Sequence, residues 1–235
     1  MKAKVSKDML QSMYNAAQAV SAREMTVVCS AGGWEMKLID PAHVAMVSAI
    51  ITADKFADYD MEDCRMCMPL DKLKTALSVM DKDIDLEFKD GRITMKSGSI
   101  RRSFASDRAD ETPKIPAFRK NDPIEVSTAV MRKAISAAAD FSSAVMFLQD
   151  SEGFHVSSSG DTDDIQMDFD VPREEERKAS YPLDYMQNIL RAMPGEVSIS
   201  YDSDYPVVIA CTDPLDMEFI LAPRIEQERS WTIRA

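Results

Sequence analysis

The chain has 235 residues, of which 45% are hydrophobic, and a formal charge of -12 at pH 7. This composition is sufficient for one large folded domain or for two domains of about 115 residues each. The negative charge argues against nonspecific attraction of the whole molecule to nucleic acid or to an anionic membrane, so binding to either would require a local basic surface.

The sequence contains no recognisable targeting or membrane-spanning segment. The amino-terminal stretch MKAKVSKDML lacks an apolar run typical of signal peptides, and no later stretch approaches the roughly 20 apolar residues of a membrane span. Four cysteines are too few for a disulfide scaffold in a chain of this length, which indicates free thiols in a reducing compartment. We therefore expect an intracellular, cytoplasmic protein.

The first half of the chain predicts two amphipathic helices, each followed by strands. The first helix covers SKDMLQSMYNAAQAV (6–20) and precedes AGGWEMKL (31–38). The second covers LDKLKTALSVM (70–80), where apolar residues recur at helical spacing, and precedes DIDLEF (83–88). DIDLEF alternates apolar and polar residues, which is the period of a strand.

The second half repeats this order at nearly constant spacing. Gly153 in SEGFHVSS lies 120 residues after Gly33, and Leu183 in PLDYMQNILRAM lies 113 residues after Leu70. Two similar halves, each with two helices beside a largely antiparallel sheet, predict an α+β fold. Three prolines and many charges follow residue 105, which indicates an exposed connector. We therefore predict similar domains over 1–106 and 124–235, joined by an interdomain connector over 107–123.

The predicted helices differ in charge from the whole chain. Over residues 7–19, 70–80, 127–139 and 183–193 the formal charges total +3, whereas the chain carries -12. If the four helices share a face, that face can meet phosphate while the remaining surface repels it. Short exposed helices often carry lysine, so an ordinary solvated face is the alternative interpretation.

Two short motifs resemble a known family. LIDPAHVAMV (38–47) and LAPRIE (221–226), together with the repeated helices and the connector, resemble the DNA polymerase sliding clamps of the proliferating cell nuclear antigen (PCNA) family, and most closely its archaeal members. The resemblance extends from the first helix to the carboxyl-terminal tail, APRIE (222–226). It implies the DNA clamp fold, with two similar domains in each subunit and three subunits in a pseudo-sixfold ring.

The resemblance also implies a function. The family consists of processivity factors for DNA replication and repair that encircle duplex DNA without sequence specificity, so we expect neither enzymatic activity nor a cofactor or metal. The implied partners are a DNA polymerase, a clamp loader, a flap nuclease and a ligase, which bind through short peptide motifs of the PIP-box type. A nucleoid-associated location in the cytoplasm follows. Both a homotrimer and a ring of different chains are open at this point.

The resemblance assigns DNA contacts to the helices that line the hole of the ring. By position, the DNA-facing residues are Lys72, Lys74, Arg132, Lys133 and Arg191. The first helix offers Gln11, Asn15 and Gln18 where basic residues are common in the family. Contact between this helix and DNA is therefore expected to be weaker.

A hydrophobic pocket for partner peptides is the second implied site. By position, its residues come from the LIDPAHVAMV motif, the connector, the DYPVV segment and the tail. They are Ile39, His43, Val44, Met46, Ile115, Pro116, Pro206, Ala222, Pro223 and Ile225. An apolar cleft of this kind accepts aliphatic and aromatic anchors, and the extended tail offers backbone groups for pairing.

Ring closure in the family pairs edge strands of neighbouring subunits, which removes exposed strand edges. By position, these strands are 99–106 and 164–171. The interface residues we expect are Arg101, Arg102, Phe104, Asp164, Asp168 and Asp170. Because the first strand is basic and the second acidic, we expect both arginines to face aspartates across the seam, which is the contact between the edge strands of two neighbouring subunits. Apolar residues are expected to provide most of this contact.

Other patterns have simpler explanations. Cys64 and Cys67 have redox or zinc-like spacing, but a zinc site normally needs four ligands, so we expect two cysteines on opposite faces of a strand. Apart from the family resemblance, the VAMV run would be an ordinary buried strand and His43 a hydrogen-bonded structural residue. The alternative function is a two-domain α+β peptide-binding adaptor or small enzyme unrelated to replication.

Overall fold

The two halves of the chain have the same order of elements. The computed structural model describes residues 1–106, 111–171 and 175–225. The first half contains β1 (Lys2–Ser6), α1 (Lys7–Ala19), β2 (Glu24–Ser30), β3 (Gly33–Ile39), β4 (Ala45–Thr52), the short 3-10 helix η1 (Ala53–Lys55), β5 (Asp58–Asp60), β6 (Cys64–Pro69), α2 (Leu70–Leu77), β7 (Asp83–Lys89), β8 (Arg92–Ser97) and β9 (Ile100–Ala105). The second half contains β10 (Ile124–Ser127), α3 (Thr128–Ala138), β11 (Ala144–Gln149), β12 (Phe154–Ser159), β13 (Asp164–Phe169), β14 (Arg177–Pro182), α4 (Leu183–Ala192), β15 (Glu196–Ser200), β16 (Val207–Cys211) and β17 (Asp216–Leu221). Apart from η1 and β5, each half reads strand, helix, four strands, helix and three strands.

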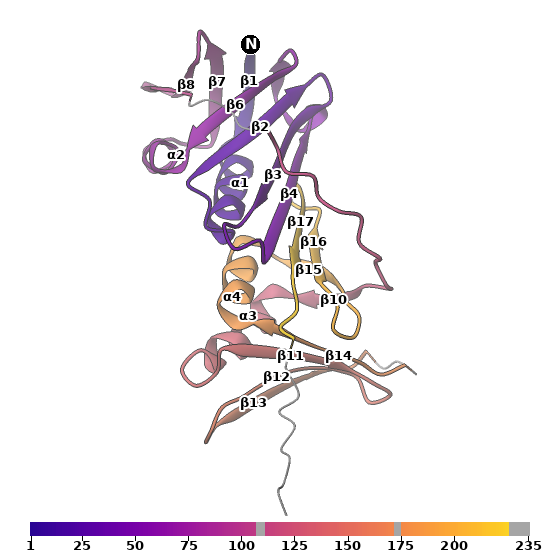
Figure 1. Ribbon diagram of the computed structural model, residues 1–235. Helices are drawn as coiled ribbons and strands as arrows, with labels where there is room; N and C mark the ends of the chain where they lie inside the picture. The colour runs from indigo at the N-terminus through magenta and orange to yellow at the C-terminus, as the bar shows by residue number, and fades with distance from the viewer. Residues whose placement is uncertain (107–110, 172–174, 226–235) are drawn as a thin grey trace, which may run out of the picture.

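All strand pairs between these elements are antiparallel, so the α+β prediction is confirmed. The sheets have the orders β5-β1-β7-β8-β9, β10-β15-β16-β17-β4-β3-β2-β6 and β13-β12-β11-β14. The eight-stranded sheet passes from one half to the other where β17 pairs with β4. Strands β9 and β13 are edges of the other two sheets, which lie at opposite ends of the molecule (Figure 1).

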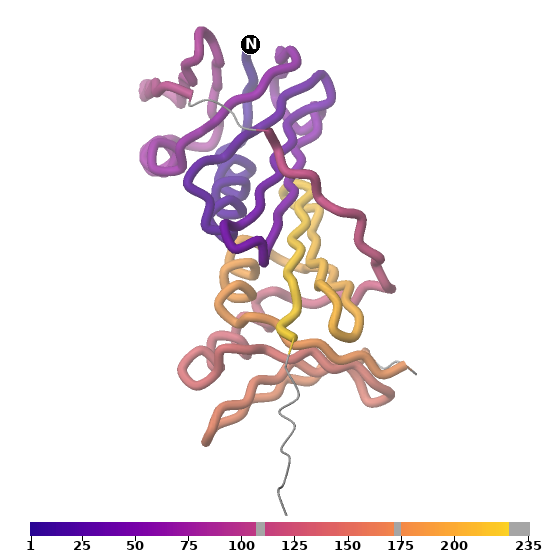
Figure 2. Tube along the Cα trace, in the orientation of Figure 1, coloured from indigo at the N-terminus to yellow at the C-terminus, as the bar shows by residue number. Residues whose placement is uncertain are grey.

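The four helices form a row along one side of the sheets. Helix α1 packs against both α2 and α4, and α4 packs against α3, so the row runs α2, α1, α4, α3 (Figure 1). The connector descends on the side of the sheets away from the helices (Figure 2). This arrangement separates a helical face from an opposite face crossed by the connector.

Two details differ from the predictions. Helix α2 ends at Leu77 rather than Met80: the Val79 N–H donates to the Ala76 carbonyl at 3.2 Å in a tighter turn, and the Met80 carbonyl beyond this turn accepts the Lys7 ammonium at 2.7 Å. A strand at the amino terminus, β1, was not predicted, since its lysines obscure the alternation of buried Ala3 and Val5. The apolar stripes of the helices are buried as predicted.

Gly33 begins β3 in a conformation that only glycine adopts easily. Its φ is +126°, and a Cβ at this position would lie 2.1 Å from the Ile51 carbonyl oxygen. We expect Gly33→Ala to lower the free energy of unfolding by roughly 1–3 kcal/mol or more, measured by urea denaturation. The neighbouring Gly32→Ala is the control, because its Cβ would meet only the Ser30 Oγ at 3.5 Å. An equal loss in both variants would contradict the steric explanation.

Candidate functional site

The helical face presents few free cations. Lys72 pairs with Asp71 on its own helix at 3.1 Å, and Arg132 donates to the Thr128 carbonyl and hydroxyl at 3.3 and 3.1 Å. Lys74, Lys133 and Arg191 are exposed and have no ionic or hydrogen-bonded partner within the described residues. These three side chains are therefore the ones available to a polyanion that approaches the helices.

Helix α1 contributes polar rather than basic groups to this face. Gln11 donates to Asn15 at 2.9 Å on its solvent side, while Lys7 is bonded to the Met80 carbonyl just beyond α2. Where α1 meets α4 there is a shallow hollow of about 300 Å³. It is lined by Asn15, Gln18, Ala19, Asn188, Arg191 and Ala192. Arg191 is the only charged residue in this lining.

Ion pairs and hydrogen bonds hold the connector against the face opposite the helices. Arg119 pairs with Asp202 and Lys120 with Glu218. Asn121 donates to the Tyr201 carbonyl at 3.0 Å, and its own carbonyl accepts the Ser200 hydroxyl at 2.9 Å. The carboxyl-terminal part of the connector therefore lies across β15 and β17.

Several predicted pocket residues lie together beside this attachment. Met46 pairs across the strands with both Ile39 and Ile220, and Ile220 pairs with Val208. Ile220 and Val208 are only 4% and 3% exposed, although they point away from the helices. An apolar row therefore crosses β3, β4, β17 and β16 on the face that the connector crosses.

The tail runs beside the same row. The Ala222 N–H donates to the Val44 carbonyl at 2.9 Å, and the pairing of Val207 with Leu221 brings Pro206 level with Ala222. Pro223 is half-buried next to Ala222. The β3–β4 turn, the β15–β16 loop and the tail therefore converge.

The remaining predicted pocket residues are less enclosed. Ile115 is half-buried and Pro116 is exposed in the connector, His43 is exposed on the β3–β4 turn, and Ile225 is 84% exposed. Glu226, the last residue of the LAPRIE motif, lies outside the described residues. An apolar anchor that bound here would cover Ile225 and reduce this exposed area.

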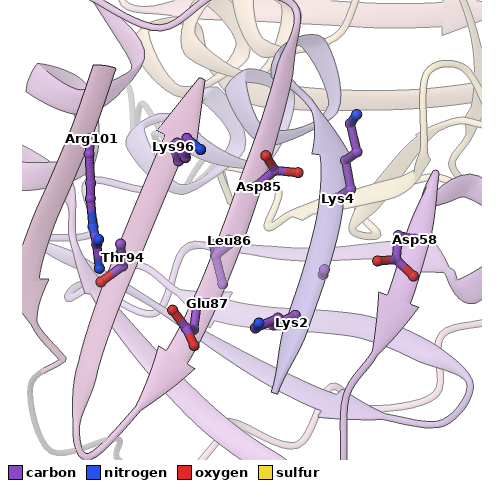
Figure 3. Close-up of a pocket in the computed structure, with 10 residues that line it drawn as sticks. Lys2, Lys4, Asp58, Asp85, Leu86, Glu87, Thr94, Lys96 and Arg101 are labelled. Atoms are coloured by element: carbon purple, nitrogen blue, oxygen red, sulfur yellow. The ribbon is translucent and has the colours of Figure 1, made fainter. Parts of the chain in front are cut away.

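The two predicted seam strands are both edge strands. On the outer face of the five-stranded sheet, residues paired across the strands form the row Asp58, Lys4, Asp85, Lys96 and Arg101. The charges alternate in sign along this row as far as its last two residues, Lys96 and Arg101, which are both positive. Like charges directly opposite each other are unfavourable, and Figure 3 shows Arg101 extended toward Thr94 rather than toward Lys96. The row lines a hollow of about 270 Å³.

Arg101 and Arg102 point to opposite faces of β9. Arg102 shares the inner face with buried Phe104, and its Nε is buried without a hydrogen-bond partner among the residues that the structure describes. Arg101 is exposed on the outer face and has no acidic partner in the described part of the chain. The two arginines therefore cannot face the same row of aspartates.

The second seam strand, β13, has an acidic outer face. Asp164, Gln166 and Asp168 are exposed there, while Ile165 and Phe169 pack on the core. His155 on β12 lies 2.7 Å from Asp168 through Nδ1 and 3.4 Å from Asp150 through Nε2. Gln166 also donates to Asp168 at 2.7 Å. Asp168 is thus the acid on this face that is engaged within the described part of its own chain, whereas Asp164 has no bonded partner there.

The hydrogen bond to Asp168 raises the pKa of His155 above its ordinary value of 6.5, with Asp150 adding to the rise and burial opposing it. Because the folded-state pKa is raised, the stabilisation is fully present below pH 6.5 and is lost as pH rises through the folded pKa. We expect His155→Gln to lose this part of the pH dependence of the unfolding free energy, measured by urea denaturation at several pH values. A profile for His155→Gln identical to that of the wild type would contradict the assignment.

The cysteines show a contact that their spacing along the chain did not predict. Cys64 and Cys67 lie on one strand, β6, and point to opposite faces, as predicted. Cys64 lies directly opposite Cys29 of β2, and burial raises the pKa of both thiols.

Among the described helices, none has the length and hydropathy to cross a membrane.

Comparisons with known proteins agree with this geometry. No protein-family model matches the chain. The DNA polymerase sliding clamp of Picrophilus torridus is 29% identical over 219 residues, covering 83% of this chain and 86% of that protein. The sliding clamp of Archaeoglobus fulgidus is 29% identical over 215 residues, covering 83% and 87%. The structure of A. fulgidus PCNA bound to the C-terminal region of FEN-1 matches with a TM-score of 0.88 and 25% identity over 97% of this chain and 99% of that chain.

The chain is therefore similar over most of its length to archaeal DNA polymerase sliding clamps. The DNA clamp fold expected from the sequence is confirmed. The assignment of individual residues in this clamp to DNA, peptide and subunit contacts stays a prediction, as does the division of the chain at residues 106 and 124.

Sequence patterns did not reveal several contacts that organise the sites of this clamp. Arg119 and Lys120 fasten the connector, and Arg224 holds the tail by donating to the Ser143 carbonyl and hydroxyl at 2.9 and 2.8 Å. Asp40, within the LIDPAHVAMV motif, accepts the Ala42, Val44 and Ala45 N–H groups of the β3–β4 turn. An aspartate directly after a strand and before a turn is a signal for side-chain capping of the turn.

Proposed function

We propose that this clamp forms a ring of three identical chains around duplex DNA and holds replication and repair proteins through the pocket beside the connector. The observation that carries this proposal is the β17–β4 junction. By element order, β17 corresponds to β9 and β4 to β13. Strands β9 and β13 are unpaired edges at opposite ends of the molecule, so repetition of the internal junction between copies removes both edges.

The internal junction supports a specific register for the seam. In β17–β4, Phe219 pairs with Val47. When the paired residues are followed from strand to strand in each half, Phe219 on β17 is equivalent to Arg102 on β9, and Val47 on β4 is equivalent to Ile165 on β13. Arg102 of one copy then lies opposite Ile165 of the next. In this register only Arg101 points toward the acidic face of β13, whereas Arg102 points toward its apolar face.

On the outer face, the same register sets Arg101 opposite Gln166 of the next copy. Asp164 and Asp168 are the diagonal neighbours of that position, within reach of a long side chain. These two aspartates would supply negative charge beside Lys96 and Arg101, the two neighbouring cations that end the charged row on the outer face of the five-stranded sheet. One chain thus carries both complementary edges, which favours a homotrimer over a ring of different chains.

Two measurements test this function. Light scattering should give a mass three times the 26.3 kDa of one chain. Polymerase extension on primed circular DNA should give longer products when the clamp and a clamp loader are added. A monomer and unchanged product length would instead support the adaptor or enzyme alternative.

The DNA contact that we propose is weak and suited to sliding. Only Lys74, Lys133 and Arg191 are free on the described helical face, and each phosphate neutralised adds about one unit to the slope of log affinity against log salt. A shallow slope on linear DNA is therefore expected, whereas a steep slope would indicate a groove-binding protein. We assign the clamp no catalytic role and a location on the nucleoid within the cytoplasm.

A further inference from the structure

The β3–β4 turn is built around one buried carboxylate. Asp40 is 1% exposed. Its Oδ1 accepts the Val44 and Ala45 N–H groups at 2.6 and 2.7 Å, and its Oδ2 accepts the Ala42 N–H at 2.9 Å. Charged hydrogen bonds of this length are stronger than neutral ones, so the carboxylate fixes the path of residues 40–45.

A fourth bond to this carboxylate comes from the other half of the chain. Tyr185, in the first turn of α4, donates its hydroxyl to Asp40 Oδ2 at 2.7 Å. The bond to Asp40 raises the pKa of Tyr185 to about 12, so the hydroxyl stays a donor at neutral pH. Burial raises the pKa of Asp40, but the N–H of Ala45, the Tyr185 hydroxyl and the other N–H groups outweigh it and leave this pKa below its ordinary value. The bond is therefore between an intact hydroxyl and a carboxylate.

The turn held in this way displays His43 to solvent. His43 has a φ of +59°, which is unfavourable for a residue with a side chain, and its N–H donates to the Asp40 carbonyl at 2.9 Å. Backbone in this region persists where surrounding contacts over-determine it, and such positions concentrate at ligand sites. The next residue, Val44, accepts the N–H of Ala222 from the tail. The turn is thus fixed by α4 on one side and by the tail on the other.

We propose that Tyr185 is a positioning residue for partner binding: through Asp40, it holds His43 and Val44 in the orientation that receives a partner peptide. The inference rests on the proposed peptide pocket and deepens it. Tyr185 touches the turn and not the peptide. Its contribution arises from preorganisation, because a turn already held in the binding conformation loses less entropy when the peptide docks.

The test uses a synthetic peptide with the sequence of the FEN-1 C-terminal region, titrated into the full-length protein by calorimetry. Tyr185→Phe removes one hydroxyl and keeps the ring. We expect roughly tenfold weaker peptide binding, as for loss of one hydrogen bond to a charged group, with unchanged ring mass. Unchanged affinity would overturn the proposal.

Tyr59→Phe is the matched control. The Tyr59 hydroxyl donates to the Ser30 carbonyl at 2.6 Å, at the opposite end of β3 from the turn and outside its hydrogen-bond network. Both variants lose one hydroxyl and its hydrogen bond, so both should lower the thermal midpoint slightly. Only Tyr185→Phe should weaken peptide binding. Equal weakening in both variants would identify general loss of stability as the cause and overturn the proposal.

A double-mutant cycle with His43→Ala separates positioning from direct contact. If Tyr185 acts through the turn, the effect of Tyr185→Phe should shrink at least threefold once the His43 side chain is absent. Additive effects would show an independent contact and overturn the positioning role. Failure of the wild-type protein to bind the peptide would overturn the proposed pocket itself, which distinguishes that outcome from failure of the Tyr185 inference.

Discussion

Arg101→Glu is expected to dissociate the ring. The substitution turns an attractive group diagonally across from Asp164 and Asp168 of the next copy into a repulsive one, and it does so at all three seams. Individual exposed ion pairs are weak, but reversal of the charge replaces attraction by repulsion. We expect the concentration at which half of the trimers dissociate to rise roughly tenfold or more, measured by light scattering or analytical ultracentrifugation over a dilution series.

The control for Arg101→Glu is the same charge change elsewhere. Arg65→Glu alters an exposed position on β6, in a different sheet, and should leave the mass distribution unchanged. The paired substitution Arg101→Glu with Asp164→Arg restores opposite charges across the proposed seam and should recover part of the trimer. If the pair behaves no better than Arg101→Glu alone, the register inferred from β17–β4 is wrong.

The helices and edge strands were predictable because they depend on local periodicity. The stripe of Leu70, Leu73 and Leu77 has helical spacing, and the alternation in DIQMDF separates acids from apolar residues. The opposite orientation of Arg101 and Arg102 also follows from the strand period. The total charge of each edge does not show this difference, because it sums residues that lie on opposite faces of the strand.

The contacts that fix the sites were not predictable from local patterns. Asp40 and Tyr185 meet across 145 positions of sequence, and Lys120 and Glu218 across 98. Such pairs depend on how the two halves pack, which no periodicity encodes. The lack of a free lysine on α1 could be predicted, because this helix has only one basic residue, Lys7. The bond from Lys7 to the Met80 carbonyl beyond α2 could not be predicted from the sequence.

Removal of the free cations on the helical face is expected to abolish most DNA attraction without affecting the ring. Lys74→Ala, Lys133→Ala and Arg191→Ala in one variant leave the four helices with only Lys7, Lys72 and Arg132 as basic residues, and all three are already bonded within the chain. Affinity for linear duplex DNA at low salt should fall by tenfold or more, and the salt dependence should approach zero, measured by fluorescence anisotropy over a salt series.

The control for the DNA variant removes the same amount of charge from the opposite face. Lys2, Lys4 and Lys96 lie on the outer face of the five-stranded sheet, around the hollow in Figure 3. Their combined replacement by alanine should leave the salt slope unchanged, because DNA inside a ring does not reach them. A loss of affinity in this variant equal to that in the helix variant would mean that DNA binds the outside, and encirclement by the helices would have to be abandoned.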